Sequence, residues 1–406
     1  MGDTKGLLRT LICGTVLLST TSAFAVDFHG RSSTQYLWFN SIFNGKKQAE
    51  FAQYLNFSVT NIDPDKKFSL HGYGRISQDV MNGTGFENRL FFLYADYRDL
   101  FDKLDIRAGR QFVNYAAGSA LIDGGMVDLK NIGPVTFSVM GGRNVVYGID
   151  NELTRAGDTV FGAAATLAGF PATNAEISYF LKQDSDGVAR ETIGAMFNQY
   201  LFNGLKLYGN TRFDMASETF EEVLAGIKYF ATADLVLTAE WFQSYPTFDY
   251  TSFYSVFAVD RYQEGSFRAD YTINEMFAVR GAYKRQDFGE NTAGDVFELG
   301  FKVRPINNLM IDVAYDRRQG YAGSLDGFTL DVQYDYSPNL QLAGGAAYDV
   351  YQKDGTTGKT NAQTYWLGTR YKIDKSMSFD LRAQDNVNVW NFKHDWSGRV
   401  AFNYDF

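Results

Sequence analysis

The chain has 406 residues, a net charge of −9 and 16% aromatic residues, with 26 Tyr, 35 Phe and only 6 Pro. The acidic balance argues against a nucleic-acid partner, which would require a basic stripe. Residues 26–406 contain no apolar run of ~18 residues, which excludes a membrane-spanning helix there. A mean hydropathy of −0.25 still permits a membrane β-barrel, whose lipid-facing residues alternate with polar ones.

Residues 1–25 are typical of a secretory signal peptide. Lys5 and Arg9 supply the positive start, residues 11–18 form a short apolar segment, and Ala23-Phe24-Ala25 matches a cleavage site before Val26. The single cysteine, Cys13, lies inside this segment. The mature chain should therefore contain neither a disulfide nor a c-type haem attachment site, and we expect no cofactor.

Residues 26–406 show no domain boundary and are predicted to form one domain of β-hairpins. Alternating stretches of about ten residues are joined by short turns rich in Asn, Asp, Gly and Pro, residues that suit preset or left-handed backbone angles. The turns are residues 61–65, 98–103, 131–134, 169–172, 202–204, 231–234, 274–275, 305–308, 337–339 and 374–376. They predict about 20–22 antiparallel strands.

The late strands alternate most clearly. Residues 296–304 place Phe297, Leu299 and Phe301 on one face and Glu298 and Lys302 on the other. A soluble β-sandwich with such strands would expose two long edges, whereas closure removes edges. Aromatic residues at strand ends also suit the two membrane interfaces. The sequence therefore favours an all-β, transmembrane, up-and-down β-barrel.

In such a barrel the polar face lines a water-filled lumen. The residues predicted to line this pore are Arg75, Arg107, Arg110, Arg212, Arg268, Arg280, Lys302, Asp331, Arg370, Arg382 and Arg399. Charged residues of this kind set the ion preference of a channel. The alternative is that they form cross-strand ion pairs that only keep the lumen wet.

Arg110 breaks the alternation, because an inward Arg107 sends Arg110 toward lipid. Either Gly109 carries a β-bulge, or Arg110 sits at the membrane rim. The bulge is favoured, and it would make Arg107 and Arg110 a basic pair beside a loop of residues 115–125.

Two further stretches leave alternatives open. The aromatic-rich residues 244–261 either fold into the lumen or dock a partner, or they extend two strands above the membrane. The small residues 162–167 indicate either a thin wall that something bulky approaches or a tight strand contact.

The three histidines, His29, His71 and His394, lack the spacing of metal ligands, and no catalytic motif is present. No metal site and no enzymatic activity are therefore predicted.

The last strand alternates from Asp395 and ends on an aromatic residue. With the signal peptide, the hairpin repeat and Ala108-Gly109-Arg110-Gln111, the terminal Asn403-Tyr404-Asp405-Phe406 resembles Gram-negative outer-membrane porins. The resemblance implies an outer-membrane location and makes Tyr404 and Phe406 the signal that the barrel-assembly machinery recognises. It also implies that Arg110 lies near the pore constriction. The chain departs from trimeric general porins in having no obvious long loop after the fifth strand.

Within porin-like proteins, the chain looks most like the barrel of porin–cytochrome electron conduits. Two functions follow: a passage for ions or small solutes, or a sheath whose partners are multihaem c-type cytochromes. The expected surroundings in both cases are outer-membrane lipid. We expect Trp396, Val400, Phe402, Tyr404 and Phe406 to face lipid, and the last strand to pair with residues 28–42.

Overall fold

A computed structural model describes residues 26–406 except 42–44, 84, 149–151, 154–156, 168–169, 171, 203, 248, 250–259, 291, 322, 354–357 and 390–391. The predicted signal peptide, residues 1–25, lies outside the described residues. In the described part, no helix is long and apolar enough to cross a membrane. The strands are β1 (Asp27–Asn40), β2 (Lys47–Thr60), β3 (Phe68–Asp79), β4 (Glu87–Leu100), β5 (Leu104–Tyr115), β6 (Gly118–Ile132), β7 (Val135–Asn144), β8 (Thr159–Leu167), β9 (Thr173–Asp184), β10 (Gly187–Phe202), β11 (Leu205–Asp214), β12 (Thr219–Phe230), β13 (Leu235–Ser244), β14 (Tyr262–Thr272), β15 (Phe277–Asp287), β16 (Ala293–Ile306), β17 (Leu309–Gly320), β18 (Gly323–Ser337), β19 (Leu340–Lys353), β20 (Thr360–Lys372), β21 (Met377–Val389) and β22 (Phe392–Asp405).

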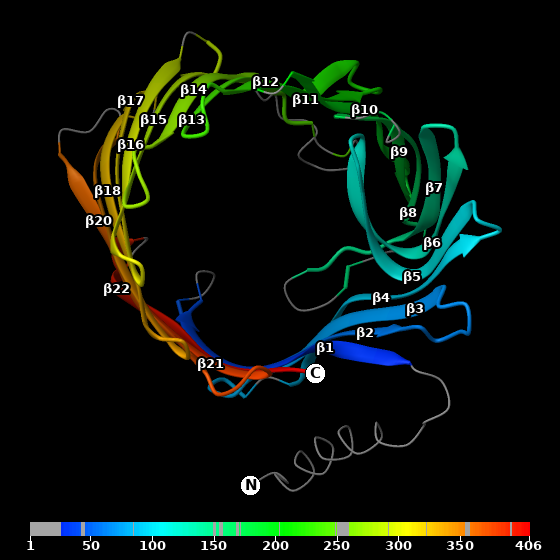
Figure 1. The fold of residues 1–406 in the computed structure, drawn as a ribbon, viewed down its shortest axis with the longest axis horizontal. Coiled ribbons are helices and arrows are strands. Elements are labelled where there is room, and N and C mark those ends of the chain that lie inside the picture. The colour runs from blue at the N-terminus through cyan, green and yellow to red at the C-terminus, as the bar shows by residue number, and fades with distance from the viewer. Residues whose placement is uncertain are drawn as a thin grey trace, which may run out of the picture.

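The strands form one closed antiparallel barrel of 22 strands (Figure 1). Each strand pairs with its neighbours in sequence, and β1 closes the ring by pairing with β22 from Arg31↔Asp405 to Trp38↔Gly398. The predicted all-β, up-and-down barrel of about 20–22 strands is therefore confirmed.

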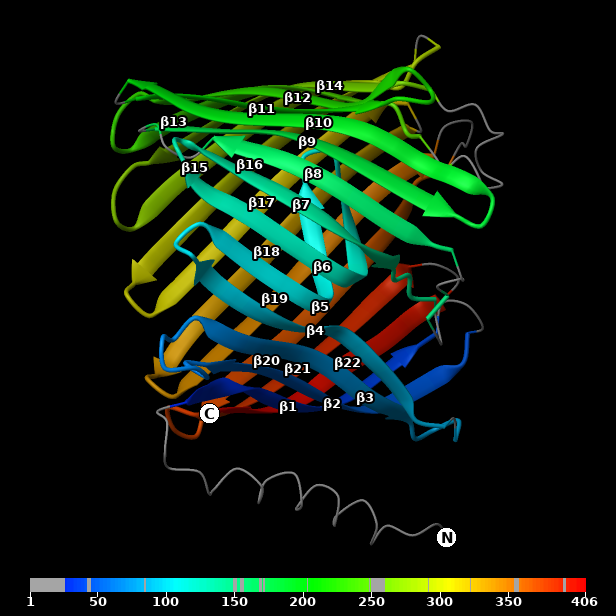
Figure 2. The ribbon, with the colours of Figure 1, turned by 90° about the vertical axis from the view of Figure 1, so that its right-hand side faces the viewer.

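The short turns lie where the sequence predicts them, between the paired strands. They gather at one end of the barrel, where the C terminus also lies (Figure 2). Left-handed backbone angles occur at Asn61, Asp99, Asn131 and Ala172, each in a different one of these turns. The Phe68 and Lys67 amides donate hydrogen bonds to the Asp63 carboxylate, and these bonds hold the pKa of Asp63 below its usual range.

The strand register identifies the inner face of the wall. Ser178 in β9 and Thr192 in β10 hydrogen-bond a hairpin that lies inside the ring, so both residues point inward (Figure 1). Residues directly opposite each other on neighbouring strands share a face. The register carries this assignment consistently around all the strands and back to β9.

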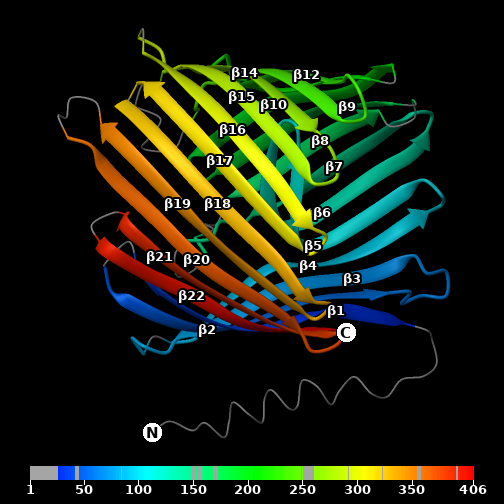
Figure 3. The same cartoon turned by 60° about the vertical axis from the view of Figure 1, so that its left-hand side comes forward.

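The outer face is apolar and exposed. Phe297, Leu299 and Phe301 of β16, with Tyr315 of β17 and Phe328 of β18, are all exposed on this face. Figure 3 shows these strands crossing the wall obliquely. Since an exposed apolar band around a closed barrel is the surface that a bilayer covers, the wall spans a membrane.

The seam between β1 and β22 combines polar contacts inside with apolar contacts outside. Arg31 Nε lies 2.5 Å from Asp405 Oδ1 on the inner face. The Phe406 amide donates to the Gly30 carbonyl over 3.0 Å, and the Phe406 ring stacks on Phe28 with ring centroids 4.9 Å apart. The predicted pairing of the last strand with residues 28–42 is confirmed.

The Phe406→Ser variant should assemble poorly. It removes the ring that stacks on Phe28 and leaves a polar side chain on the outer face, so we expect several-fold less folded barrel in membranes. Heat-modifiable migration on gels measures the folded fraction. Phe406→Tyr, which keeps the ring, is the control; wild-type amounts of folded Phe406→Ser barrel would show that the terminal ring is dispensable.

Candidate functional site

The register places all the predicted pore-lining residues except Arg110 on the inner face of the wall. These are Arg75, Arg107, Arg212, Arg268, Arg280, Lys302, Asp331, Arg370, Arg382 and Arg399. They are spread around the ring and do not form a single cluster. Their part in conduction remains a prediction.

Many of these charges have ion partners. Among the directly opposed pairs, Arg370 Nε lies 2.6 Å from Asp380 Oδ1, and Arg107 Nε lies 3.6 Å from Asp96 Oδ1. Arg75 pairs with Glu50. Lys302, Arg212 and Arg268 have carboxylate partners at 3.1–3.9 Å. The partner of Arg268 is Asp270 of the same strand, so the hypothesis of cross-strand ion pairs holds for the other five residues.

The β5–β6 hairpin leaves the wall and enters the lumen. β5 pairs with β4 only up to Leu93↔Arg110, and β6 pairs with β7 only up to Ile122↔Asn144. Residues 111–121 therefore pair with neither β4 nor β7, their neighbours in the wall. Gly109 marks the departure, because its φ of 128° is a backbone conformation that side chains rarely allow.

The predicted bulge at Gly109 is wrong. The register of β5 runs without an inserted residue from Ile106 to Arg110 against β4, and throughout β5 against β6. The change of direction comes from the backbone angle of Gly109 instead. The predicted loop of residues 115–125 is also mostly strand, since β6 begins at Gly118.

The tip of the hairpin is fixed to the inner wall of β9–β11. The Ala116 amide donates to Glu176 Oε1 over 2.7 Å, and the Ala117 amide donates to Ser178 Oγ over 2.9 Å. Thr192 Oγ1 donates to the Ala117 carbonyl over 2.7 Å. The hairpin therefore crosses part of the lumen and is held at both ends (Figure 1).

An apolar core fills the space between the hairpin and the wall of β7–β9. Val113 and Ile122 of the hairpin pack with Met140, Val160 and Phe180 of the wall, and all are buried. Burying each of these side chains contributes roughly 1.5–3 kcal/mol, so the hairpin is a packed element of the fold. The small residues 162–167, predicted to mark either a thin wall or a tight strand contact, include Ala164 of β8, which belongs to this core.

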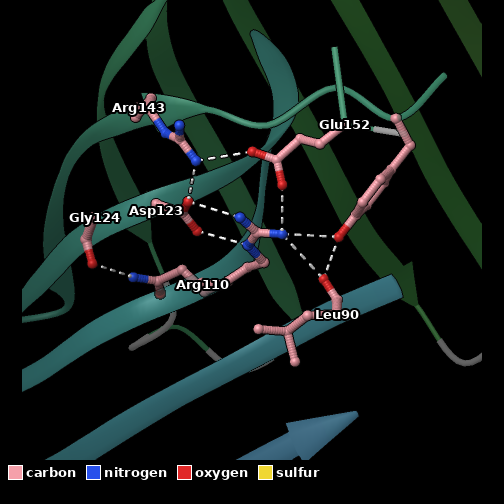
Figure 4. Close-up of polar contacts among 8 residues, drawn as sticks. Leu90, Arg110, Asp123, Gly124, Arg143 and Glu152 are labelled. Carbon is pink, nitrogen blue, oxygen red and sulfur yellow. Dashed lines mark hydrogen bonds and ion pairs between the residues drawn. The ribbon is translucent and has the colours of Figure 1, made fainter. Parts of the chain in front are cut away.

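Arg110 is the centre of a charge network at the base of the hairpin (Figure 4). Its Nε and Nη2 donate to the two carboxylate oxygens of Asp123 over 2.7 and 2.8 Å, and its Nη1 lies 3.0 Å from Glu152 Oε2. Arg143 Nη2 bridges the same two carboxylates at 2.8 Å each. A bidentate guanidinium–carboxylate pair is among the stronger polar contacts in proteins.

The network ties the segment after β7 to the edge of β4. The Leu90 carbonyl accepts hydrogen bonds from the Tyr147 hydroxyl and from Arg110 Nη1, the latter over 3.3 Å. Arg89 Nη2 donates to the Gly148 carbonyl over 3.2 Å. The two bonds to Leu90 satisfy a backbone carbonyl of β4 beyond the point where β5 departs, which matters because unpaired backbone groups are costly within a membrane.

A third segment folds inward. Most of the predicted aromatic loop lies outside the described residues, but Thr247 and Asp249 are described. Arg190 of β10 donates to the Thr247 carbonyl over 2.7 Å and pairs with Asp249, which also contacts Lys182. Since Arg190 and Lys182 lie on the inner face, these two loop residues are on the lumen side.

The hairpin was missed by the sequence interpretation because alternation continues through it. Its signals are the glycines that permit close approach: a Cβ on Gly194 would clash with the backbone of Ala116 and Ala117. Of the described residues, no group of three or more His, Cys, Asp or Glu side chains could hold a metal ion. The site can narrow a passage and present charge of both signs.

Comparisons with known proteins show the fold. No family model matches the chain, and a search of curated protein sequences finds no match. A mutant of the ferric enterobactin receptor PfeA of Pseudomonas aeruginosa aligns with a TM-score of 0.63 and 9% identity, covering 95% of this chain and 81% of that chain. The siderophore receptor PirA of the same organism gives 0.63 and 10%, with coverages of 95% and 82%. OccAB2 of Acinetobacter baumannii gives 0.49 and 10%, with coverages of 94% and 98%. The PfeA and PirA likenesses show that the chain shares the barrel of these proteins, and at such identity they show the fold alone.

Proposed function

We propose that the chain forms a porin-like passage for ions and small solutes across the outer membrane of a Gram-negative bacterium. The observation that carries the proposal is the contrast between the two faces of a closed wall. The outer face is an exposed apolar band, whereas the inner face carries charged residues of both signs. A polar lumen inside an apolar wall is the arrangement that admits water and dissolved ions.

A hollow in the inner wall supports an aqueous interior. It measures about 850 Å³ and is lined mainly by polar residues of β1–β3 and β20–β22, among them Gln35, Asn56, Arg399 and Asn403. Barrels of this size in outer-membrane transporters have a plugged lumen. Here the β5–β6 hairpin, the segment after β7 and residues 247 and 249 enter from one side of the ring, so we infer a narrowed passage.

The resemblance of Tyr404 and Phe406 to a barrel-assembly signal agrees with an outer-membrane location. The outward position of Tyr404 and the stacking of Phe406 on Phe28 put both residues where a lipid-facing or protein-facing signal would be accessible. Recognition by the assembly machinery belongs to the proposal.

Planar-bilayer recording of the purified full-length protein tests the function. We expect stable stepwise openings whose conductance scales with salt concentration. A barrel that is silent in pure form and co-purifies with haem protein would contradict the passage and favour a sheath for multihaem c-type cytochromes. Heat-modifiable migration of the same sample confirms that the barrel tested is folded.

A further inference from the structure

The inner wall next to the seam carries arginines in two different electrostatic situations. Arg370 and Arg31 are neutralised by Asp380 and Asp405 at 2.6 and 2.5 Å. Asp380 also accepts a hydrogen bond from Asn403 Nδ2 over 2.7 Å. Both carboxylates are therefore engaged and unavailable to other cations.

Arg382 and Arg399 have no carboxylate partner within the described part of the chain. They stand directly opposite each other on β21 and β22, both on the inner face and both exposed. Directly opposed residues have Cβ atoms about 5 Å apart, and like charges in that position are unfavourable unless something between them is negative. Two arginines without a carboxylate partner thus stand side by side on the wall, and the polar contact that Arg382 makes is a neutral one, from its Nη2 to Gln384 Oε1 over 3.4 Å.

The surroundings of the two arginines differ: an aromatic ring holds Arg382, and Arg399 borders open space. The residue opposite Arg382 on β20 is Gly368, and the residue opposite Arg399 on β1 is Leu37, so neither neighbouring strand offers a counter-charge. The Arg382 guanidinium lies 4.8 Å from the centroid of the Trp366 ring, and such stacking fixes its plane. Arg399 lines the hollow of about 850 Å³ described above.

We propose that Arg382 and Arg399 form a binding subsite for small oxyanions, carboxylate- or phosphate-bearing solutes, on the wall of the passage. The inference rests on the proposed function in that the solute reaches the subsite through the lumen. A planar guanidinium group can donate two parallel hydrogen bonds to a pair of oxygens on such an anion. A spherical chloride ion offers no such pair of acceptors. An anion between the arginines relieves their mutual repulsion.

Two measurements test the subsite. Planar bilayers are recorded at about 0.1 M KCl, where the electrostatic screening length is roughly 10 Å. Sodium phosphate and sodium succinate are added separately, and the reduction of the chloride current is measured. Equilibrium dialysis of radiolabelled phosphate against folded protein in detergent measures binding without requiring conduction. The variants are Arg382→Gln, Arg399→Gln and the double variant.

Lys284→Gln is the matched control. It removes one positive charge from the inner wall of β15, where Lys284 is already neutralised by Glu298 at 2.6 Å. We expect the double variant to weaken the apparent oxyanion affinity at least about tenfold and the control to leave it within about twofold, because only the double variant removes both charge-assisted contacts. The probe with the higher apparent affinity, phosphate or succinate, identifies the preferred oxyanion.

The outcomes separate the two proposals. A silent barrel that binds phosphate in a manner sensitive to both arginines would overturn the passage and keep the subsite. A conducting barrel whose phosphate and succinate affinities are unchanged in the double variant would overturn the subsite and keep the passage. Equal losses in the double variant and in Lys284→Gln would also overturn the subsite, because they would reflect the overall charge of the lumen.

Discussion

The Gly194→Val variant is expected to conduct at least about twofold more current than the wild type, because the inward hairpin can no longer seat on the wall. A Cβ at position 194 would overlap the backbone of Ala116 and Ala117, and no side-chain rotation relieves a clash with backbone. Overpacking of this kind costs about 1–3 kcal/mol, enough to displace the tip at Ala116 and Ala117 while the apolar core around Val113 and Ile122 stays packed. Single-channel recording measures the effect.

The control for this prediction is Gly265→Val in β14. This glycine faces outward, and nothing lies within 4 Å of an added Cβ, so conductance should not change. A cysteine pair at Ala117 and Ser178 supplies a second check, because the Ala117 amide and Ser178 Oγ are 2.9 Å apart. Oxidation should lock the hairpin at wild-type conductance; a conductance unaffected by Gly194→Val would show that the hairpin does not narrow the passage.

The Arg110→Met variant should loosen the base of the hairpin and the segment after β7. It leaves Asp123 and Glu152 facing each other with only Arg143 between them. Losing charge-assisted hydrogen bonds in a site where Arg110 is only 12% exposed should cost about 2 kcal/mol of local stability. Hydrogen exchange of residues 145–148 should rise by roughly thirtyfold, and current noise should increase.

Arg143→Met is the matched variant, since Arg143 contacts the same two carboxylates. Its side chain is 48% exposed, and exposed pairs contribute little, so exchange should rise much less than in Arg110→Met. Equal effects of the two substitutions would show that Arg110 has no special role in holding the segment.

The wall of the barrel could be predicted from the sequence because its determinants are local. Period-two alternation assigns Phe297, Leu299 and Phe301 to one face without knowledge of any partner. Turn residues such as Asn61 and Asn131 mark strand ends because they adopt left-handed angles. The pairing of β22 with β1 could be predicted because the alternating final strand needs a partner that closes the ring.

The contents of the lumen could not be predicted in the same way. Whether β5 continues in the wall or bends inward depends on Gly109, whose φ of 128° has no counterpart in the alternation pattern. It also depends on contacts with Glu176 and Ser178, which follow much later in the chain. Arg110 breaks the alternation and is therefore conspicuous in the sequence, whereas its partner Glu152 lies beyond β7 and carries no local signal.

The docking contacts of the hairpin have a consequence for the order of assembly. They join residues 60 to 96 positions apart, from Ala116–Glu176 to Arg212–Ala116, whereas the seam joins Arg31 to Asp405 across 374 positions. Closing a short stretch of chain loses less entropy than closing a long one. The β5–β6 hairpin can therefore dock as soon as β11 has formed, while the sheet is still open. The remaining strands then close the barrel around a hairpin that is already in place.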